Sequence, residues 1–270
     1  MKKSKILSIV LIPFFCFPAT YFLNNKTQTT LNPLLKVNEE EQITIPLSQL
    51  ATIDKAYDSP SFSKIKMSCS IDTDNLTLSI DKIDSGDIEE DFLNLTFNDT
   101  YSYEGKQYKI NEIGDNCFSS IQEKYGESLQ THLIGTINFS NSLSDIDDFS
   151  FYGLKNVDFA FYSLRYARKI GDYAFADCDK LSSTYDNSLD LSSFNRLESI
   201  GDHAFYNDVN VYALSLPSNT NCSLTHIYQS AFENCTNLSG SIKLSSTISF
   251  LENDIFKNIK GFSEITFSWT

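Results

Sequence analysis

The stretch that decides the fold reads Ile170-Gly171-Asp172-Tyr173-Ala174-Phe175. Other segments repeat its pattern: an aliphatic residue, three variable residues, a small or apolar residue, and a phenylalanine. Three close copies are Ile113–Phe118, Ile200–Phe205 and Ile227–Phe232, and two weaker ones are Ile146–Phe151 and Leu251–Phe256. One pattern that recurs at fixed offsets indicates a repeat architecture.

The spacing of the copies identifies the kind of repeat. Successive phenylalanines lie from 24 residues apart (Phe151 to Phe175) to 33 residues apart (Phe118 to Phe151). The shortest spacing falls within the roughly 20–29 residues of a leucine-rich repeat, and longer spacings indicate loop insertions. Because no single copy can bury its own isoleucine and phenylalanine, we expect the copies to stack into one continuous core.

Short alternating stretches follow several copies. Val211, Leu214 and Leu216 form one of them, and such alternation predicts a strand. The five-residue step from Ile170 to Phe175 suits a short helical turn on the opposite side of the repeat. The sequence therefore predicts an α/β repeat solenoid, a leucine-rich repeat with short strands and short helical turns, preceded by a β-rich cap.

Two copies continue through a Cys-x-x-Leu step, in Phe175-Ala176-Asp177-Cys178-Asp179-Lys180-Leu181 and Phe232-Glu233-Asn234-Cys235-Thr236-Asn237-Leu238. With these residues the chain resembles the BspA-type leucine-rich repeat family over about 101–267. The resemblance implies an exported, surface-exposed adhesin of bacteria or protists without catalytic residues. The sequence departs from the family pattern at Asp208, which stands where a cysteine is expected.

Four segments are predicted along the chain: a signal peptide or anchor in 1–23, a polar spacer in 24–59, a β-rich cap in 60–110, and about six repeat copies in 111–270. The first segment carries Lys2, Lys3 and Lys5 before an uncharged apolar run that ends at Leu23, the layout of an export signal. Three interpretations stay open: a cleaved signal peptide, an uncleaved anchor, and a lipid on Cys16. All three predict an extracellular or cell-surface protein.

Composition and motifs exclude several functions. The 21 Lys and Arg against 35 Asp and Glu give a net charge of −14, which argues against nucleic acid and anionic lipid as partners. The sequence lacks phosphate-loop, zinc-protease and nucleophile-elbow motifs, so we expect no catalytic residue, no cofactor and no metal site. Without C-x-x-C spacing, we expect free buried thiols at Cys117, Cys178 and Cys235, with a Cys69–Cys222 bridge as the alternative.

Solenoids bind partners on the strands that line one side of the stack. Aligning the strands at 211–217 and 262–268 directs Leu214, Leu216, Ile265 and Phe267 inward. The outward, partner-binding residues are then Ala213, Ser215, Glu264 and Thr266, joined in an earlier copy by Phe159 and Phe161. Exposed aromatic residues are typical of protein interfaces. A slip of one residue exchanges the two faces, and in that alternative both phenylalanines lie in the core.

These features predict a non-catalytic surface protein that acts in adhesion or protein–protein interaction. The expected partner is a protein or glycoconjugate on a cell surface, and membrane contact is expected only through the N-terminal segment. The alternative is a scaffold of the cell envelope that self-associates through an open C-terminal end, because Trp269 and Thr270 directly follow the last strand. An enzyme with its site in 43–100 is a third interpretation, which the motif content disfavours.

Overall fold

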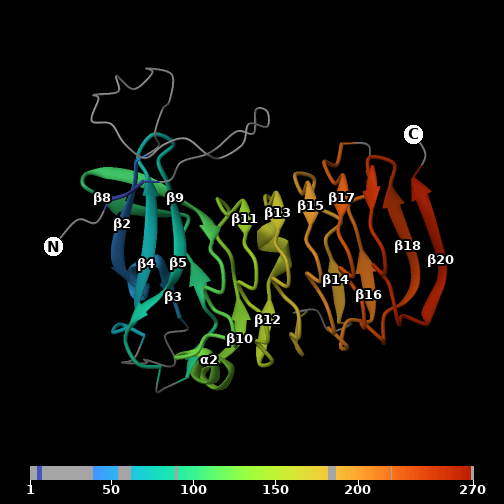
Figure 1. Cartoon of the computed structure of the whole chain (residues 1–270), viewed down its shortest axis with the longest axis horizontal. Coiled ribbons are helices and arrows are strands. Elements are labelled where there is room, and N and C mark those ends of the chain that lie inside the picture. The colour runs from blue at the N-terminus through green and yellow to red at the C-terminus, as the bar shows by residue number, and fades with distance from the viewer. Residues whose placement is uncertain are drawn as a thin grey trace, which may run out of the picture.

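The computed structural model is an elongated stack of coils along the long axis of the molecule (Figure 1). It describes residues 39–53, 62–88, 91–181, 187–219 and 221–268, together with strand β1 (Lys5–Leu7). Helical structure in these residues is limited to α1 (Leu47–Leu50), α2 (Gly126–His132) and the 3-10 turn η1 (Phe161–Leu164). The predicted repeat solenoid is confirmed, and most of its regular structure is strand.

One long sheet forms the first wall of the solenoid. Its order is β1-β2-β4-β5-β9-β11-β13-β15-β17-β19, with β8 paired to β9. From β1 to β5 the pairing is antiparallel, and from β5 onwards the strands of the main path are parallel, one from each coil. The bounds are β2 (Glu39–Pro46), β4 (Lys66–Asp72), β5 (Thr77–Ser85), β8 (Thr100–Tyr103), β9 (Lys106–Ile113), β11 (Asp145–Ile146), β13 (Lys169–Ile170), β15 (Ser199–Ile200), β17 (His226–Ile227) and β19 (Phe250–Leu251).

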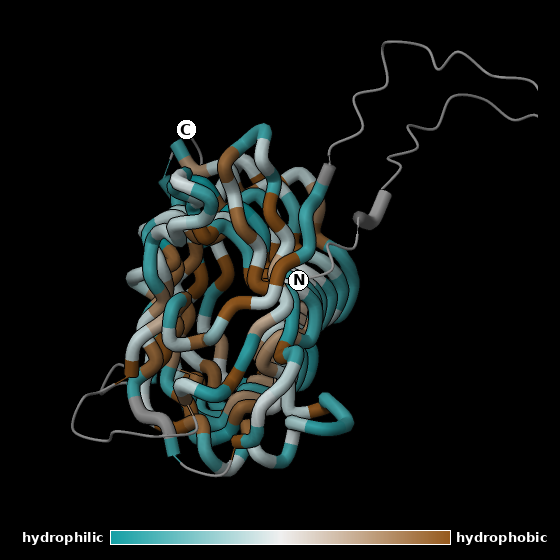
Figure 2. The backbone as a smooth tube through the Cα atoms, turned by 90° about the vertical axis from the view of Figure 1, so that its left-hand side faces the viewer, coloured by the Kyte–Doolittle hydropathy of each residue, from teal (hydrophilic) through white to brown (hydrophobic). Residues whose placement is uncertain are grey.

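Smaller parallel sheets form the second wall, in the orders β6-β10-β12, β14-β16 and β18-β20. Figure 2 shows brown apolar segments lining the space between the walls. A separate antiparallel pair joins β3 (Ala51–Thr52) to β7 (Thr96–Phe97). The remaining bounds are β6 (Phe92–Leu93), β10 (Leu133–Ile137), β12 (Val157–Phe159), β14 (Ser188–Asp190), β16 (Ala213–Ser215), β18 (Ser239–Ser245) and β20 (Gly261–Ser268).

The repeated phenylalanines stack as a single column inside the solenoid. The ring centroids of neighbouring copies lie 5.8, 5.5, 5.5, 5.2 and 5.7 Å apart, and each pair is close to parallel. The column is Phe118, Phe151, Phe175, Phe205, Phe232 and Phe256. The first five rings are buried, so the predicted continuous core is confirmed.

The segment between Ile170 and Phe175 differs from the predicted helical turn. Tyr173 and Asp177 adopt left-handed backbone, with φ of 53° and 58°, and a left-handed residue every four positions breaks a helix. The chain forms successive hydrogen-bonded turns, whose N–H groups bond to the next coil. Those of Tyr173 and Asp177 donate to the carbonyls of Asp202 and Tyr206, at 2.9 Å each.

The outward placement of Phe159 and Phe161 is wrong. Phe159 ends β12, whose inward residues are Val157 and Phe159, so the register is one residue away from the predicted frame. Its ring packs edge-on against Phe175 at 5.0 Å, and Phe161 packs against the same ring at 5.1 Å. Both phenylalanines are therefore core residues, as in the alternative register.

Strand β20 shows the opposite difference. Ile265 and Phe267 were predicted to point into the core, yet both are exposed. Their partners in β18 across the register, Ile242 and Leu244, are buried. Because β20 is the outermost strand of its sheet and no described coil covers its far side, these side chains remain open to solvent.

Five cysteines are free buried thiols: Cys69, Cys117, Cys178, Cys222 and Cys235. The alternative Cys69–Cys222 bridge is therefore absent, while Cys16 lies outside the described residues.

The first wall extends into the predicted polar spacer. Strand β2 lies within 24–59, pairs with β4, and buries Ile43 and Ile45. Apart from β1, which pairs with β2, the predicted export segment lies outside the described residues. Among the helices that the structure describes, none has the length and apolar character of a membrane span.

Candidate binding surface

The residue before each inward aliphatic residue lies on the outer face of the first wall. In the register of the parallel strands these residues are direct neighbours, about 4.8 Å apart from coil to coil. The isoleucines that follow them, from Ile113 to Ile227, are buried. The outward row runs Glu112, Asp145, Lys169, Ser199, His226 and Phe250, so its chemistry changes from acidic to aromatic along the stack.

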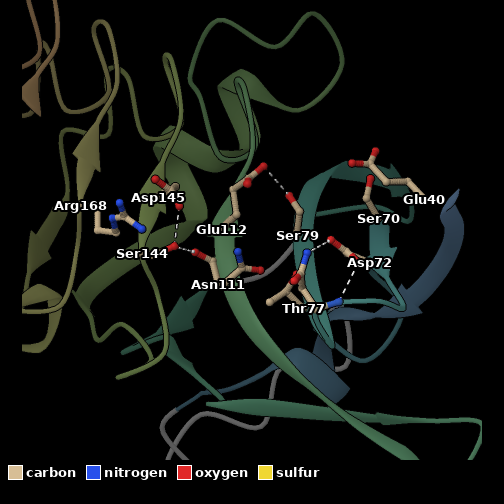
Figure 3. Close-up of a pocket in the computed structure, with 11 residues that line it drawn as sticks. Glu40, Ser70, Asp72, Thr77, Ser79, Asn111, Glu112, Ser144, Asp145 and Arg168 are labelled. Atoms are coloured by element: carbon tan, nitrogen blue, oxygen red, sulfur yellow. Dashed lines mark hydrogen bonds between the residues drawn. The ribbon is translucent and has the colours of Figure 1, made fainter. Parts of the chain in front are cut away.

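An open pocket of about 420 Å³ lies at the acidic end of this row (Figure 3). The Ser79 hydroxyl donates to Glu112 Oε1 at 3.1 Å, and the Ser144 hydroxyl donates to Asp145 Oδ2 at 2.5 Å. Arg168 closes the far side. The pocket thus offers hydrogen-bonding groups from the cap strands and from the first coils together.

Electrostatics set the protonation of this pocket. Burial raises the pKa of Glu112 to about 7, and the nearby Asp147 carboxylate adds to the shift. Lys169 Nζ lies 3.2 Å from Asp147 Oδ1. Within the described part of the chain, no three His, Cys, Asp or Glu residues are grouped to hold a metal ion. The polar lining of the pocket offers hydrogen-bonding groups, among them the Glu112 carboxyl with its pKa of about 7.

Three aromatic side chains gather at the other end of the row. The His226 ring stacks on Phe250 with centroids 4.9 Å apart and an interplanar angle of 10°, and it contacts Tyr228 at 5.8 Å. Phe250 is 59% exposed and Tyr228 is 39% exposed. We call His226, Tyr228 and Phe250 the aromatic cluster. Exposed rings beside polar residues are the groups that protein interfaces use as anchors.

The predicted partner-binding residues on the second wall lie mostly where the sequence placed them. Ala213, Ser215 and Glu264 are exposed, and Thr266 is half-buried. Across the β18–β20 register, Glu264 faces Ser241 and Thr266 faces Lys243. These residues form a polar strip, but Phe159 and Phe161 contribute no exposed ring to it, because both are buried.

Sequence reasoning missed the aromatic cluster. Phe250 and His226 occupy the position just before the aliphatic residue of a copy, and Tyr228 follows that residue. Comparing the copies at this position would have revealed the outward row. The residue at this position differs from copy to copy, whereas the residue that follows it is always aliphatic.

Comparison with known protein families gives a match over most of the chain. Residues 41–182 and 122–262 match the model described as the BspA type leucine-rich repeat region, with six copies. Among curated proteins, none is similar enough to count as a match.

Two solved bacterial structures resemble the chain. The pneumococcal vaccine antigen PcpA is 17% identical, with 82% of this chain and 50% of that chain covered and a TM-score of 0.51. A leucine-rich cell surface protein from Faecalibacterium prausnitzii is also 17% identical. The match covers 77% of this chain and 54% of that chain, with a TM-score of 0.47. The chain spans about half the length of these proteins, and the likeness to PcpA shows a shared fold.

Proposed function

The chain belongs to the BspA-type leucine-rich repeat family, and from this premise we propose that it is an exported recognition protein that binds a partner by surface contact, without catalysis. The partner is a protein or glycoconjugate on a cell surface. The basic and apolar residues of 1–23 support export, and they are the one segment expected to contact a membrane.

One observation carries this proposal: the repeat keeps its constant residues inside and its variable residues outside. Ile146, Ile170, Ile200 and Ile227 are buried, whereas the row before them varies from Asp145 to Phe250. A surface that varies on a constant scaffold suits recognition of an extended partner. The aromatic cluster supplies exposed rings at one end of this row, so we place the main partner contact there.

The test compares partner binding with stability in a Tyr228→Ser/Phe250→Ser double variant. Proteins captured from a cell-surface extract by the wild-type chain are identified, and the affinity of one purified partner is measured for both. Loss of two anchor rings should weaken binding at least about tenfold, because anchors contribute about 2 kcal/mol or more each. The melting temperature should stay unchanged, since the rings are exposed.

Two control variants make the result specific. Tyr212→Ser removes an exposed ring near the second wall and should leave the affinity unchanged. A loss of affinity in this variant would instead place the partner contact on the polar strip that contains Ala213 and Ser215. Phe159→Ser removes a core ring and should lower the melting temperature strongly. Unchanged binding by the double variant would contradict the proposed contact.

A second candidate function is self-association as a scaffold of the cell envelope. Ile265, Phe267 and Leu251 are exposed and line one open pocket of the last described coil, beside β20. Exposed apolar side chains at a sheet edge favour pairing with another chain. Light scattering distinguishes the two functions, because a scaffold assembles as its concentration rises and a recognition protein stays at constant mass.

A further inference from the structure

All three arginines of this acidic chain lie in one small area. They are Arg165, Arg168 and Arg196. Tyr166 stands among them: the guanidinium carbon of Arg165 lies 5.0 Å from the ring centroid, and that of Arg196 lies 5.5 Å from it. We call these four residues the arginine patch. The chain has a net charge of −14, yet the arginine patch contains every one of its arginines, so positive charge is concentrated in this area.

The arginine patch borders an open pocket of about 420 Å³. Tyr166, Arg168 and Arg196 line it together with Lys109, and hydroxyl or amide side chains come from Thr100, Asn141 and Ser142. Arg165 and Tyr166 lie just before β13, and Arg196 lies just before β15, so the patch crosses two coils. Three cationic side chains therefore line one open pocket, and the fourth, Arg165, lies against Tyr166 beside it.

The charges of the patch are only partly neutralised. Arg168 pairs with Glu198, donating from Nη2 at 2.7 Å and from Nε at 3.0 Å to the same carboxylate oxygen. Within the described residues, neither Arg165 nor Arg196 forms an ion pair with a carboxylate. Asp99, the pocket's one described carboxylate, accepts the backbone N–H of Asn141 at 2.7 Å. The guanidinium groups of Arg165 and Arg196 thus keep donors for a ligand.

Tyr166 has a positioning role in this arrangement. A guanidinium held against an aromatic ring loses less freedom on binding, and its planar edge presents paired donors that match a carboxylate or sulfate. The 38% exposure of Tyr166 leaves the ring at the surface rather than in the core. The ring therefore holds two guanidinium groups ready for an anion.

We propose that the arginine patch binds the carboxylate or sulfate groups of an anionic polysaccharide. Charge complementarity requires an anion, and Thr100 and Asn141 add exposed groups that can bond sugar hydroxyls. An acidic peptide fits less well, because a peptide anchor needs an apolar pocket and the side chains here are polar apart from Tyr166. The arginine patch shares no residue with the aromatic cluster. Binding of the polysaccharide therefore goes beyond the proposed partner contact, and each of the two can be tested without the other.

The experiment measures fluorescence anisotropy of two labelled probes, a heparin hexasaccharide and an oligoguluronate, with the full chain at low and high salt. Saturable binding that weakens with salt is expected. An Arg165→Gln/Arg196→Gln variant should bind at least about tenfold more weakly, because hydrogen bonds to charged groups are individually strong. A Lys243→Gln/Lys260→Gln control, with the same change in net charge elsewhere, should keep its affinity.

The positioning role has its own comparison. Tyr166→Ala should weaken probe binding, whereas Tyr162→Ala, which removes an exposed ring that holds no arginine, should not. Melting temperatures of all variants should match the wild type. Absence of binding to both probes at low salt, equal losses in the arginine and lysine variants, or tighter binding of a glutamate decapeptide than of either glycan would each overturn the proposal.

Discussion

Asp208 is a fully buried carboxyl at a repeat position that is occupied in other copies by Leu154, Cys178, Cys235 and Ile259. Its Oδ1 accepts the backbone N–H of Cys178 at 2.8 Å, while its Oδ2 is the one buried side-chain oxygen without a hydrogen-bond partner among the described residues. Burial raises the pKa of Asp208 well above its usual range. The folded protein therefore holds this carboxyl in its neutral form.

This single residue predicts a change in the pH dependence of stability. An unfolded aspartate ionises near about pH 3.9, so above that pH the folded state binds one more proton than the unfolded state, and stability falls as pH rises. An Asp208→Cys variant restores the residue of the neighbouring copies. Its free energy of unfolding relative to that of the wild type should be higher at pH 7 than at pH 4, although the variant also removes the acceptor of the Cys178 N–H.

Urea denaturation at pH 4 and pH 7 checks this prediction. The difference in favour of Asp208→Cys should shrink at pH 4, where about half of the unfolded aspartate is protonated. Asp190→Asn, at an exposed position of β14, serves as the control and should show the wild-type pH dependence. A stability difference that is the same at pH 4 and pH 7 would contradict the neutral buried carboxyl.

At the level of the strands and turns, aspartates just after the first-wall strands connect successive coils through side-chain hydrogen bonds. Asp148 Oδ1 accepts the backbone N–H of Asp172 at 2.8 Å, and Asp172 Oδ1 accepts that of Asp202 at 2.7 Å. Asp115 accepts the N–H of Asp148 in the same way, at 3.1 Å. Each coil thus supplies an acceptor for the next, at the corner where the strand ends.

Removing one of these aspartate hydrogen bonds should weaken the contact between two neighbouring coils. Asp172→Ala leaves the N–H of Asp202 without its acceptor and should lower the free energy of unfolding by about 1–3 kcal/mol. Asp172→Asn keeps an acceptor oxygen and should lose much less. Urea denaturation of both variants measures the difference, and equal losses would show that the hydrogen bond contributes nothing.

At the scale of the whole molecule, the stacked core was predictable because stacking itself fixes the offsets in the sequence. Phe175 and Phe205 must lie at equivalent points of successive coils. The offsets within each copy therefore stay constant even where the loops between copies differ in length. Strand faces were harder to predict. Strand β12 has three residues, and so short a strand does not fix its register, which is why Phe159 was assigned to the wrong side.

The surface sites were missed for a different reason. Tyr166 and Arg196 are brought together by neighbouring coils, and so are His226 and Phe250, although 30 and 24 residues separate them along the chain. Both pairs occupy matched positions of successive copies, one residue before an apolar residue of the pattern, so aligning the copies at these positions would have indicated the neighbours. The parallel register of the coils then brings these side chains together.

The repeated phenylalanines form one column in which each ring packs on the next. A double-mutant cycle with Phe175→Leu and Phe205→Leu, whose rings lie 5.5 Å apart, measures that packing directly. The coupling energy should be about 0.5–1.5 kcal/mol, whereas Phe118→Leu and Phe232→Leu, which lie at separate points of the column, should be additive within about 0.5 kcal/mol. A coupling near zero for Phe175 and Phe205, or one of equal size for both pairs, would contradict the stacked column.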